Sequence, residues 1–244
     1  MLKASNNLIK DLKKQKRENS SLLFLDNIKI INDAISNGLR PKLILVQNEK
    51  LNKWDNICPS FLVESKVIEQ LSDCKTPQGV LCVAEYPQHV DFQKPKTNFL
   101  VIDGLQDPGN VGTLIRTAVA CKFNQIYLLD SVKPTNSKLV RSSVGTIFYA
   151  KITSCTREEF ALHAKQWRLP LMKADMNGQN LFSCRFDDIV GVVVGNEGQG
   201  VSQTISQICT KAISLPMEKN VESLNAAVSG GVIMYHIYTQ NNNI

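Results

Sequence analysis

The chain alternates short apolar runs with helical patterns, which is the arrangement of an α/β protein. Before residue 98, apolar residues recur at helical spacing from Leu25 to Ile35, ahead of Gly38. Three runs typical of short strands occupy 43–46, 61–63 and 79–84. These elements predict a small α/β domain. The polar stretch 86–98 contains two prolines and no clear period, so we expect it to be a linker.

After residue 98 the pattern is strand, helix, strand, and further strands follow toward the carboxyl end. Strands are expected at 99–102, 126–129, 189–194 and 212–215, and helices at 111–122 and 223–238. The run 189–194 has no polar side chain, which is typical of a parallel strand covered on both faces. We therefore expect an open parallel α/β sheet over 98–244, behind a first domain over 1–90.

The charge of the chain favours a polyanionic partner. Its 244 residues carry a formal net charge of +6, and 43% are hydrophobic, enough for a buried core in each of two domains. Before residue 98 there are 15 Lys and Arg against 11 Asp and Glu, and from residue 98 onward 13 against 11. The excess lies mainly in the first segment, so that segment is the better candidate for binding the polyanion.

The seven cysteines are scattered, with no C-x-x-C pair and no histidine at zinc-ligand spacing. This pattern predicts reduced thiols in a cytoplasmic protein and no metal site. The amino terminus leads into no sustained apolar region, and no run approaches the length needed to cross a bilayer. Secretion and membrane insertion are both disfavoured.

Asn110 and Arg116 are the first candidate site residues. The turn before Asn110 follows a predicted strand, at the edge where open α/β sheets bind ligands. Asn110 is also well placed to cap the helix that it begins. Arg116 lies about 140° around this helix from Val111, at about 100° per residue, so it is expected to face away from the buried stripe.

A glycine loop from Gly195 to Gly200 follows a second buried strand. Its three glycines permit positive φ and close approach of the backbone to a ligand. Glu197 within the loop can accept hydrogen bonds from an arginine or a ribose. The loop is not Gly-x-Gly-x-x-Gly, which counts against a Rossmann dinucleotide or Rossmann methyltransferase site.

A third block near the carboxyl end joins Leu215, the end of a predicted strand, to a helix that is expected to begin at Ser223. Free backbone N–H groups are available at such a helix start, and Ser223 can cap it. Gly230 and Gly231 lie inside this helix, where each costs about 1 kcal/mol relative to alanine. Their presence indicates a backbone that packs very closely against a neighbour.

Asn-x-Gly-x-x-x-Arg at 110–116, the loop 195–200 and the block 215–231 occur in the order of three known motifs. Together they resemble the motifs of the SpoU (TrmH-like) RNA ribose 2'-O-methyltransferases of the SPOUT superfamily. The resemblance extends over about 98–240. It implies a parallel sheet with a C-terminal trefoil knot, S-adenosyl-L-methionine as cofactor and a homodimer. By position and length, the first segment is similar to the L30e-like substrate-binding domain of many members.

The resemblance also implies roles for individual residues. The cofactor pocket would be lined by the main chain of Gly195, Leu215 and Leu224. The polar site around the target ribose would consist of Asn110, Arg116, Glu197, Ser223 and Asn225. Phosphate contacts are expected from cations of two basic stretches, namely Lys138, Arg141, Lys13, Lys14 and Arg17.

Two roles for Arg116 remain open from the sequence. Either it becomes a base locally, with a substrate phosphate and Ser223 involved, or it stays cationic and stabilises a developing alkoxide. Ribosomal RNA is the favoured substrate and tRNA the second. The rivals are a catalytically silent RNA- or ribosome-binding protein of this fold, a nucleotide-binding oxidoreductase, and a SPOUT enzyme that methylates a base nitrogen.

Overall fold

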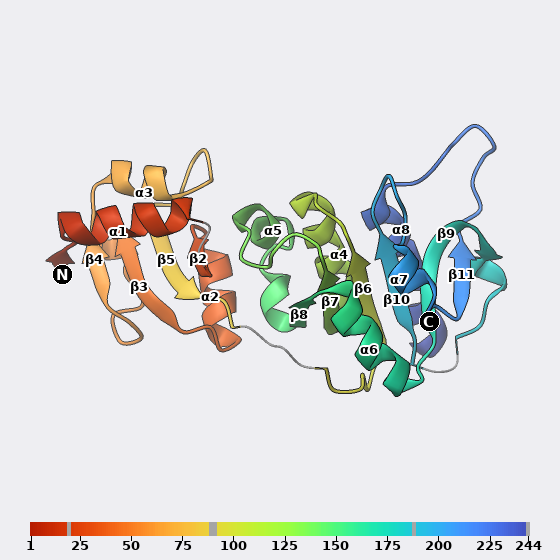
Figure 1. The fold of residues 1–244 in the computed structure, drawn as a ribbon. Coiled ribbons are helices and arrows are strands. Elements are labelled where there is room, and N and C mark those ends of the chain that lie inside the picture. The colour runs from red at the N-terminus through yellow and green to blue at the C-terminus, as the bar shows by residue number, and fades with distance from the viewer. Residues whose placement is uncertain (19–20, 88–91, 187–188, 243–244) are drawn as a thin grey trace. The chain divides into compact units, whose positions relative to one another are not determined.

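The computed structural model describes residues 1–18, 21–87, 92–186 and 189–242 (Figure 1). The chain divides into two compact units. The first comprises Met1–Pro87 and Thr135–Arg141, and the second comprises Gln88–Pro134 and Ser142–Ile244. The segment Thr135–Arg141 therefore groups with the first unit, although the chain on either side of it belongs to the second. The linear division at 90–98 did not anticipate this.

The first unit is built on a mixed five-stranded sheet. Its strands, in spatial order, are β1 (Leu2–Lys3), β4 (Ser60–Leu62), β3 (Pro41–Val46), β5 (Val80–Glu85) and β2 (Leu22–Leu25). Strand β5 is antiparallel to both β3 and β2, whereas β4 is parallel to β1 and β3. The helices of Met1–Pro87 are α1 (Asn6–Arg17), α2 (Ile28–Ser36), the single 3-10 turn η1 (Glu49–Leu51) and α3 (Ser65–Leu71).

Strand β2 differs from the sequence prediction, which placed Leu25 in a helix. All four residues of β2 are buried, and the helix begins only at Ile28. The side chain of Asn27 caps it by accepting a hydrogen bond from the Ile30 N–H at 3.1 Å. Helices α1 and α3 pack against the sheet through Leu12, Ile68 and Leu71, which share one core with Leu45 and Leu81.

The second unit is an open sheet of six strands, and every pair is parallel, as predicted. In spatial order the strands are β11 (Lys211–Ser214), β9 (Leu171–Asn180), β10 (Gly191–Gly195), β6 (Phe99–Asp103), β7 (Gln125–Leu129) and β8 (Lys151–Cys155). The helices are α4 (Pro108–Ala120), α6 (Arg157–Trp167), α7 (Gln203–Ser206) and α8 (Ala226–Asn242), with 3-10 turns η2 (Thr146–Tyr149) and η3 (Leu181–Ser183). Helix α5 (Ser137–Ser142) lies almost wholly in Thr135–Arg141 and so groups with the first unit.

Helices cover both faces of this sheet. On one face, Phe160 and Trp167 of α6 and Ile205 of α7 pack with Val193 of β10 in one apolar core. The next residue of β10, Val194, points to the opposite face, because side chains alternate along a strand. There α4 and α8 pack against each other and α8 packs on β10 (Figure 1).

Helices α4 and α8 lie side by side and run in the same direction. At their starts, Asn225 donates a hydrogen bond to Asn110, and at their ends, the Lys122 ammonium lies 3.4 Å from the side-chain oxygen of Asn242. Gly230 permits the close packing: a Cβ at this position would lie 2.5 Å from Leu114 and 2.9 Å from Val194. The close approach inferred from the helix glycines is therefore explained at Gly230.

The strand order changes direction between β6 and β10. From β6 the chain moves outward through β7 and β8, and then returns to β9 and β10 on the other side of β6. Asp103 and Gly195, the last residues of β6 and β10, are register partners. Open α/β sheets bind ligands at such a switch point, outside the carboxyl ends of the strands.

The trefoil knot stays a prediction. None of the described helices is long and apolar enough to span a membrane.

Candidate active site

A cavity of about 410 Å³ opens at the carboxyl ends of β10 and β11, beside the middle of β9. Gly195, Leu215 and Leu224, the three positions predicted to hold the cofactor, all line it. Glu197 and Ser223 line it as well. The fold thus brings together five of the eight residues expected at the cofactor and the ribose, from segments that are widely separated in the sequence.

The loop after β10 folds back on itself and gives the cavity a main-chain wall. Asn196 and Gly200 exchange two backbone hydrogen bonds, of 3.0 and 2.8 Å. A Cβ on Gly195 would lie 2.3 Å from the backbone carbon of Gly200, so only glycine fits there. Of the three loop glycines, only Gly200 has a positive φ, of +68°.

The side chain of Asn196 holds this loop in shape. Its Nδ2 donates to the carbonyl of Gly104 at 3.0 Å, and its Oδ1 accepts from the N–H groups of Gly198 and Gln199. Asn196 therefore joins the ends of β6 and β10. Sequence reasoning did not single it out, because a loop asparagine has many ordinary uses.

Three of the predicted polar residues form a hydrogen-bonded relay. The Nδ2 of Asn110 donates to Oε1 of Glu197 at 2.6 Å, and the Nδ2 of Asn225 donates to Oδ1 of Asn110 at 3.0 Å. These residues come from α4, the glycine loop and the start of α8. The relay lies where both helices begin, and the positive ends of two helix dipoles favour the carboxylate of Glu197.

Helix capping differs from the prediction and explains why this relay is possible. Asp107, not Asn110, caps α4 by accepting from the Asn110 N–H at 2.8 Å. Asn225, not Ser223, caps α8, because its Oδ1 accepts from the N–H groups of Ala227 and Val228. Helix α8 begins at Ala226, and Ser223 lies in the preceding loop. The side chain of Asn110 is thereby left for Glu197 and Asn225.

Arg116 is exposed on α4, and this agrees with its predicted position away from the buried stripe. The described residues that line the cavity do not include it, and no ion pair joins it to another described residue. The structure thus places Arg116 on the same helix as Asn110, outside the lining of the cavity of its own chain.

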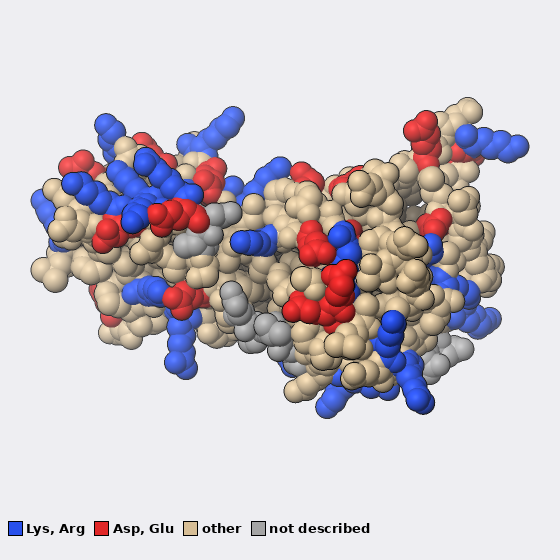
Figure 2. All heavy atoms as spheres, viewed as in Figure 1, with Lys and Arg blue, Asp and Glu red and all other residues tan. Residues whose placement is uncertain are grey.

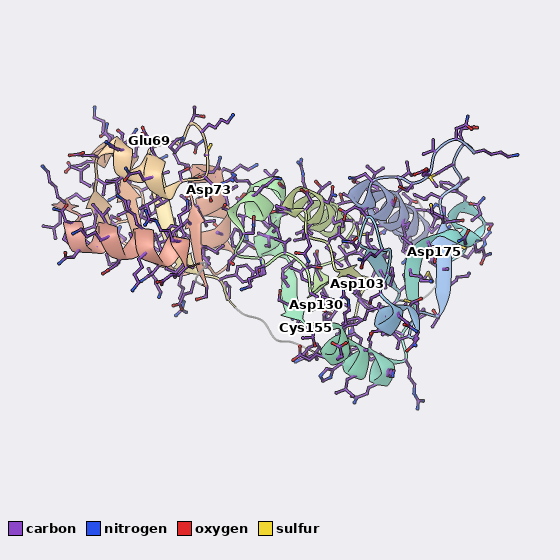
Figure 3. The ribbon with its side chains drawn as sticks, turned by 45° about the horizontal axis from the view of Figure 1, so that its top comes forward. Glu69, Asp73, Asp103, Asp130, Cys155 and Asp175 are labelled. Carbon is purple, nitrogen blue, oxygen red and sulfur yellow. The ribbon has the colours of Figure 1, made fainter. Side chains whose placement is uncertain are left out.

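A buried carboxylate anchors the same edge of the sheet (Figure 3). Asp103 is fully buried and accepts from Nε of Arg157 at 2.6 Å and from the Ser202 N–H at 2.7 Å. Arg157 also pairs with Asp130 at 3.2 Å. The hydrogen bond to Asp103 raises the pKa of Arg157 above its ordinary value. This network ties α6 and the end of the glycine loop to β6 and β7.

Lys173 and Asp175 also line the cavity, and sequence reasoning missed both. The Lys173 ammonium lies 2.9 Å from Asp175 Oδ2 and donates to Ser206 Oγ at 2.9 Å. The hydrogen bond from Lys173, followed by one from the Asn177 N–H, lowers the pKa of Asp175 below its ordinary value. Figure 3 labels Asp175 beside β9 and β11. Because β9 itself was not predicted, its polar residues gave no usable signal.

The cations expected to contact phosphate occupy α1 and α5, and several have partners within the chain. Lys14 pairs with Glu18 at 3.8 Å and remains exposed. Arg141 lies 3.7 Å from the buried carboxylate of Asp26. Lys138 is exposed on α5. Lys13 and Arg17 lie on α1, beside a separate hollow of the first unit.

The cysteines are free thiols in the structure. Burial raises the pKa of Cys82, Cys155 and Cys209 to about 12 in each case, so these thiols stay protonated near neutral pH. Among the described residues, no group of three or more His, Cys, Asp or Glu side chains is placed to hold a metal ion.

Comparison with known proteins identifies the family. Residues 97–235, more than half of the chain, match the model described as the SpoU rRNA Methylase family. The chain belongs to this family. The motifs at 110–116 and 195–200, and the third block from 215 through 231, all fall inside the matched region.

Curated relatives and solved structures extend the likeness to the first unit. A Synechocystis protein described as an uncharacterized tRNA/rRNA methyltransferase is 32% identical over 186 residues, which cover 74% of this chain and 68% of the relative. The 23S rRNA (guanosine(2553)-2'-O)-methyltransferase RlmP of Bacillus subtilis is 26% identical and covers 96% of this chain and 97% of its own. The SpoU methyltransferase AviRb from Streptomyces viridochromogenes, solved in complex with AdoMet, shares the fold with a TM-score of 0.86 at 23% identity, over 98% of this chain and 99% of its own.

Proposed function

We propose that this protein transfers the methyl group of S-adenosyl-L-methionine to a ribose 2'-hydroxyl of ribosomal RNA, with tRNA as the second candidate substrate. One observation carries the proposal: the predicted cofactor positions line one cavity, and the relay of Glu197, Asn110 and Asn225 borders it. Family membership supports the reaction, and the name of RlmP, a 23S rRNA 2'-O-methyltransferase, supports ribosomal RNA.

The residues of the cavity fit the proposed cofactor. Ile213, Leu215, Leu224 and Ile233 supply apolar walls for an adenine ring, and the cavity volume is within the range of small-molecule sites. The main chain from Gly195 to Val201 lines the cavity as well and offers polar groups for a ribose. Asp175, which pairs with Lys173, adds a carboxylate to the cavity wall. A dinucleotide fits less well, because no phosphate-binding glycine signature is present.

When bound, the cofactor supplies a methyl group on a positively charged sulfur, which is a good leaving group. The protein must then chiefly align the ribose oxygen, and alignment can contribute about 7–11 kcal/mol in favourable cases. The relay suits this task because Asn225 orients Asn110, and Asn110 in turn holds Glu197. Glu197 engages Asn110 through Oε1, which leaves Oε2 to accept a hydrogen bond from a ribose hydroxyl.

We propose that the ribose hydroxyl loses its proton beside Arg116. An arginine is ordinarily a permanent cation with five N–H donors, so it stabilises a developing alkoxide better than it accepts a proton. In that role, a substrate phosphate or solvent takes the proton. In the alternative role, a phosphate and Ser223 make Arg116 the base. Both roles require Arg116 to reach a ribose, and Arg116 does not line the cavity of its own chain.

We propose a homodimer in which Arg116 serves the site of the second copy. Helix α8 exposes Val228, Val232 and Tyr235 at 52%, 37% and 50%, and their spacing places them on one helix face. Such an apolar stripe suits burial against a second copy. A partner docked over α8 and the adjacent α4 would meet Arg116, so each chain would contribute this residue to the site of the other.

We propose that the enzyme acts in the cytoplasm.

Calorimetry of the purified protein with S-adenosylmethionine and with its demethylated product tests the cofactor. We expect stoichiometric binding of both. An absence of binding to either, with and without RNA, would remove the proposed function, and tight binding of NAD would favour an oxidoreductase. A catalytically silent RNA-binding protein would bind RNA and transfer no methyl group.

Mapping of methylation in total RNA from cells with and without the gene tests the substrate. We expect one ribose methyl to disappear from ribosomal RNA in cells that lack the gene. Loss of a ribose methyl from tRNA would select the second candidate. Loss of a base methyl would assign the chain a different reaction.

A further inference from the structure

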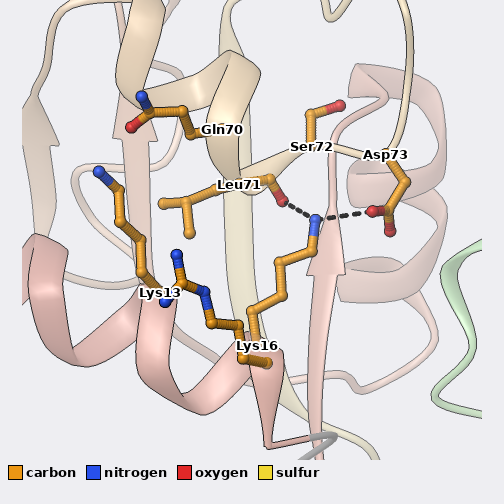
Figure 4. A pocket seen from close by; sticks show the side chains of 7 residues that line it. Lys13, Lys16, Gln70, Leu71, Ser72 and Asp73 are labelled. Atoms are coloured by element: carbon orange, nitrogen blue, oxygen red, sulfur yellow. Dashed lines mark hydrogen bonds and ion pairs between the residues drawn. The ribbon is translucent and has the colours of Figure 1, made fainter.

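The first unit contains a hollow of about 490 Å³ between the end of α1 and the end of α3 (Figure 4). Lys13, Lys16 and Arg17 line it from α1, and the opposite wall consists of residues 70–73. Figure 2 shows Lys and Arg side chains gathered over α1 and α3 on the face in view. The hollow lies wholly within the first unit and is separate from the cofactor cavity.

Lys16 is not available to a ligand. Its ammonium donates to the carbonyl of Leu71 at 2.6 Å and pairs with Asp73 at 2.8 Å, and only 21% of its side chain is exposed (Figure 4). Partial burial by itself would raise the pKa of Asp73, but the hydrogen bonds from Lys16 and Ser137 and the charge of Arg141 outweigh it and lower the pKa. Asp73 therefore stays ionised, and the pair joins α1 to the end of α3.

Lys13 and Arg17 remain as the cations of this hollow. They are four residues apart on α1, so they lie on one face of the helix. No ion pair joins either of them to another described residue. The carboxylate of the hollow, Asp73, pairs with Lys16, so Lys13 and Arg17 repel each other and an anion between them removes the repulsion. The obvious anionic ligand for an RNA-modifying enzyme is a phosphate of the RNA backbone.

The remaining wall suits the rest of a nucleotide. The exposed amide of Gln70 can donate to and accept from the edge of a base. The planar guanidinium of Arg17 can bind a phosphate through two N–H groups or stack on a base, and proteins use both contacts to read unpaired RNA. A paired base presents neither its face nor its full edge, so the combination favours an unpaired nucleotide.

We propose that this hollow binds one unpaired nucleotide of the RNA substrate, with Lys13 and Arg17 on its backbone phosphate and Gln70 on its base. The proposal rests on the proposed function, which makes RNA the substrate. It separates Lys13 and Arg17 from Lys14, which pairs with Glu18 and is not among the described residues of the hollow.

The test compares two double variants of the full chain that remove the same charge from the same helix. K13Q/R17Q empties the hollow of free cations, whereas K10Q/K14Q changes exposed lysines elsewhere on α1. The probe is a fluorescent single-stranded oligouridylate of about 12 nucleotides, followed by anisotropy over a range of salt concentrations. We expect K13Q/R17Q to weaken binding about tenfold or more and to reduce the salt slope by about 0.7–1. We expect K10Q/K14Q to change affinity less than about threefold. Equal losses in the two variants would overturn the proposal.

Three further measurements sharpen the result. Q70A should weaken binding of the oligonucleotide a few-fold and leave the salt slope unchanged, because it removes a base contact and no charge. A duplex RNA of the same length should bind less tightly than the single strand. If the duplex binds as tightly as the single strand and K13Q/R17Q abolishes duplex binding, the requirement for an unpaired nucleotide is overturned. Displacement of the oligonucleotide by micromolar inorganic phosphate would assign the hollow to a free anion instead.

Cofactor binding separates this proposal from the proposed function. Calorimetry with S-adenosylmethionine should give the same affinity for K13Q/R17Q, K10Q/K14Q and the unaltered protein. If none of the three binds the cofactor, the proposed function fails while the oligonucleotide measurements still decide the role of the hollow. Loss of cofactor binding in K13Q/R17Q alone would show a structural effect and contradict a local phosphate site.

Discussion

Arg116 is the residue on which the proposed methyl transfer depends most directly. Because it is exposed on α4, Arg116→Ala should leave folding and cofactor affinity nearly unchanged. We expect it to lower methyl transfer by about 10² or more. Arg116→Lys should restore little, since an ammonium cannot reproduce a planar group with several donors. The measurements are single-turnover methyl transfer and calorimetry, and full activity of the alanine variant would make Arg116 an ordinary surface residue.

Asn225 performs two tasks that substitutions can separate. Its Oδ1 caps α8, and its Nδ2 orients Asn110. Asn225→Ser keeps a capping oxygen, so its unfolding free energy should stay near that of the unaltered protein, whereas Asn225→Ala should lose about 1 kcal/mol. Both variants should lower methyl transfer by about tenfold or more, because both lose the hydrogen bond to Asn110. Denaturant unfolding and methyl-transfer rates check this, and a fully active serine variant would show that the relay is dispensable.

From the motifs alone, the sequence indicated five residues that the structure brings to one cavity, but it did not indicate the local roles of the candidate residues. Asn110 and Ser223 are both good capping residues, so propensity placed each at the start of a helix. In the structure Asp107 caps α4 and Asn225 caps α8, and the side chain of Asn110 donates to Glu197 instead. A contact such as Asn110 to Glu197 joins residues 87 apart, and no local pattern predicts it.

Two adjacent glycines of α8 differ in how closely other residues pack against them: Gly230 is closely packed, and Gly231 is not. A methyl group at Gly230 would overlap Leu114 and Val194, whereas one at Gly231 would lie 3.6 Å from Thr117, an ordinary contact. Gly230→Ala should therefore destabilise the fold by about 1–3 kcal/mol despite the better helix propensity of alanine. Gly231→Ala should be neutral or stabilise by up to about 1 kcal/mol.

Thermal or denaturant unfolding of the two glycine variants tests this comparison. The variants must be measured at one protein concentration, because the stability of a dimer depends on it. Equal destabilisation by both substitutions would mean that Gly231 is also covered closely, and the natural candidate would be a second copy of the chain.

Several elements were not predicted from the sequence, and the reasons differ. Strand β2 is buried throughout, so its run of leucines and phenylalanine merged with the helical pattern that follows it. Strand β9 has a two-residue period, but from Lys173 onward its residues are exposed or half-buried and form no apolar run that would mark a strand. Helix α6 is polar on its outer face, and its capping box at Thr156 was overlooked. The buried strands β6, β7 and β10 were predicted to within about two residues, because continuous burial leaves a continuous apolar run.

The proposed dimer is a property of the whole molecule that one face of α8 controls. Val228→Glu together with Val232→Glu places two charges in the exposed stripe without touching the described cavity residues. Light scattering should show a particle of twice the 27.2 kDa chain mass for the unaltered protein and one of the chain mass for the double variant. Methyl transfer should fall with dimerisation if Arg116 acts in the partner's site. An unaltered protein that is monomeric at micromolar concentration would contradict the dimer.

The grouping of Thr135–Arg141 with the first unit limits which gene segments related proteins can exchange. The chain passes from one unit to the other after Pro87, Pro134 and Arg141, so the first unit is assembled from two separate stretches of the gene. An exchange of residues 1–87 between related genes would leave the short second stretch behind, still matched to its former neighbours. Asp26 and Asp73 would then lose the partners they have in Arg141 and Ser137. Viable chimaeras of this family should therefore carry both stretches from the same parent.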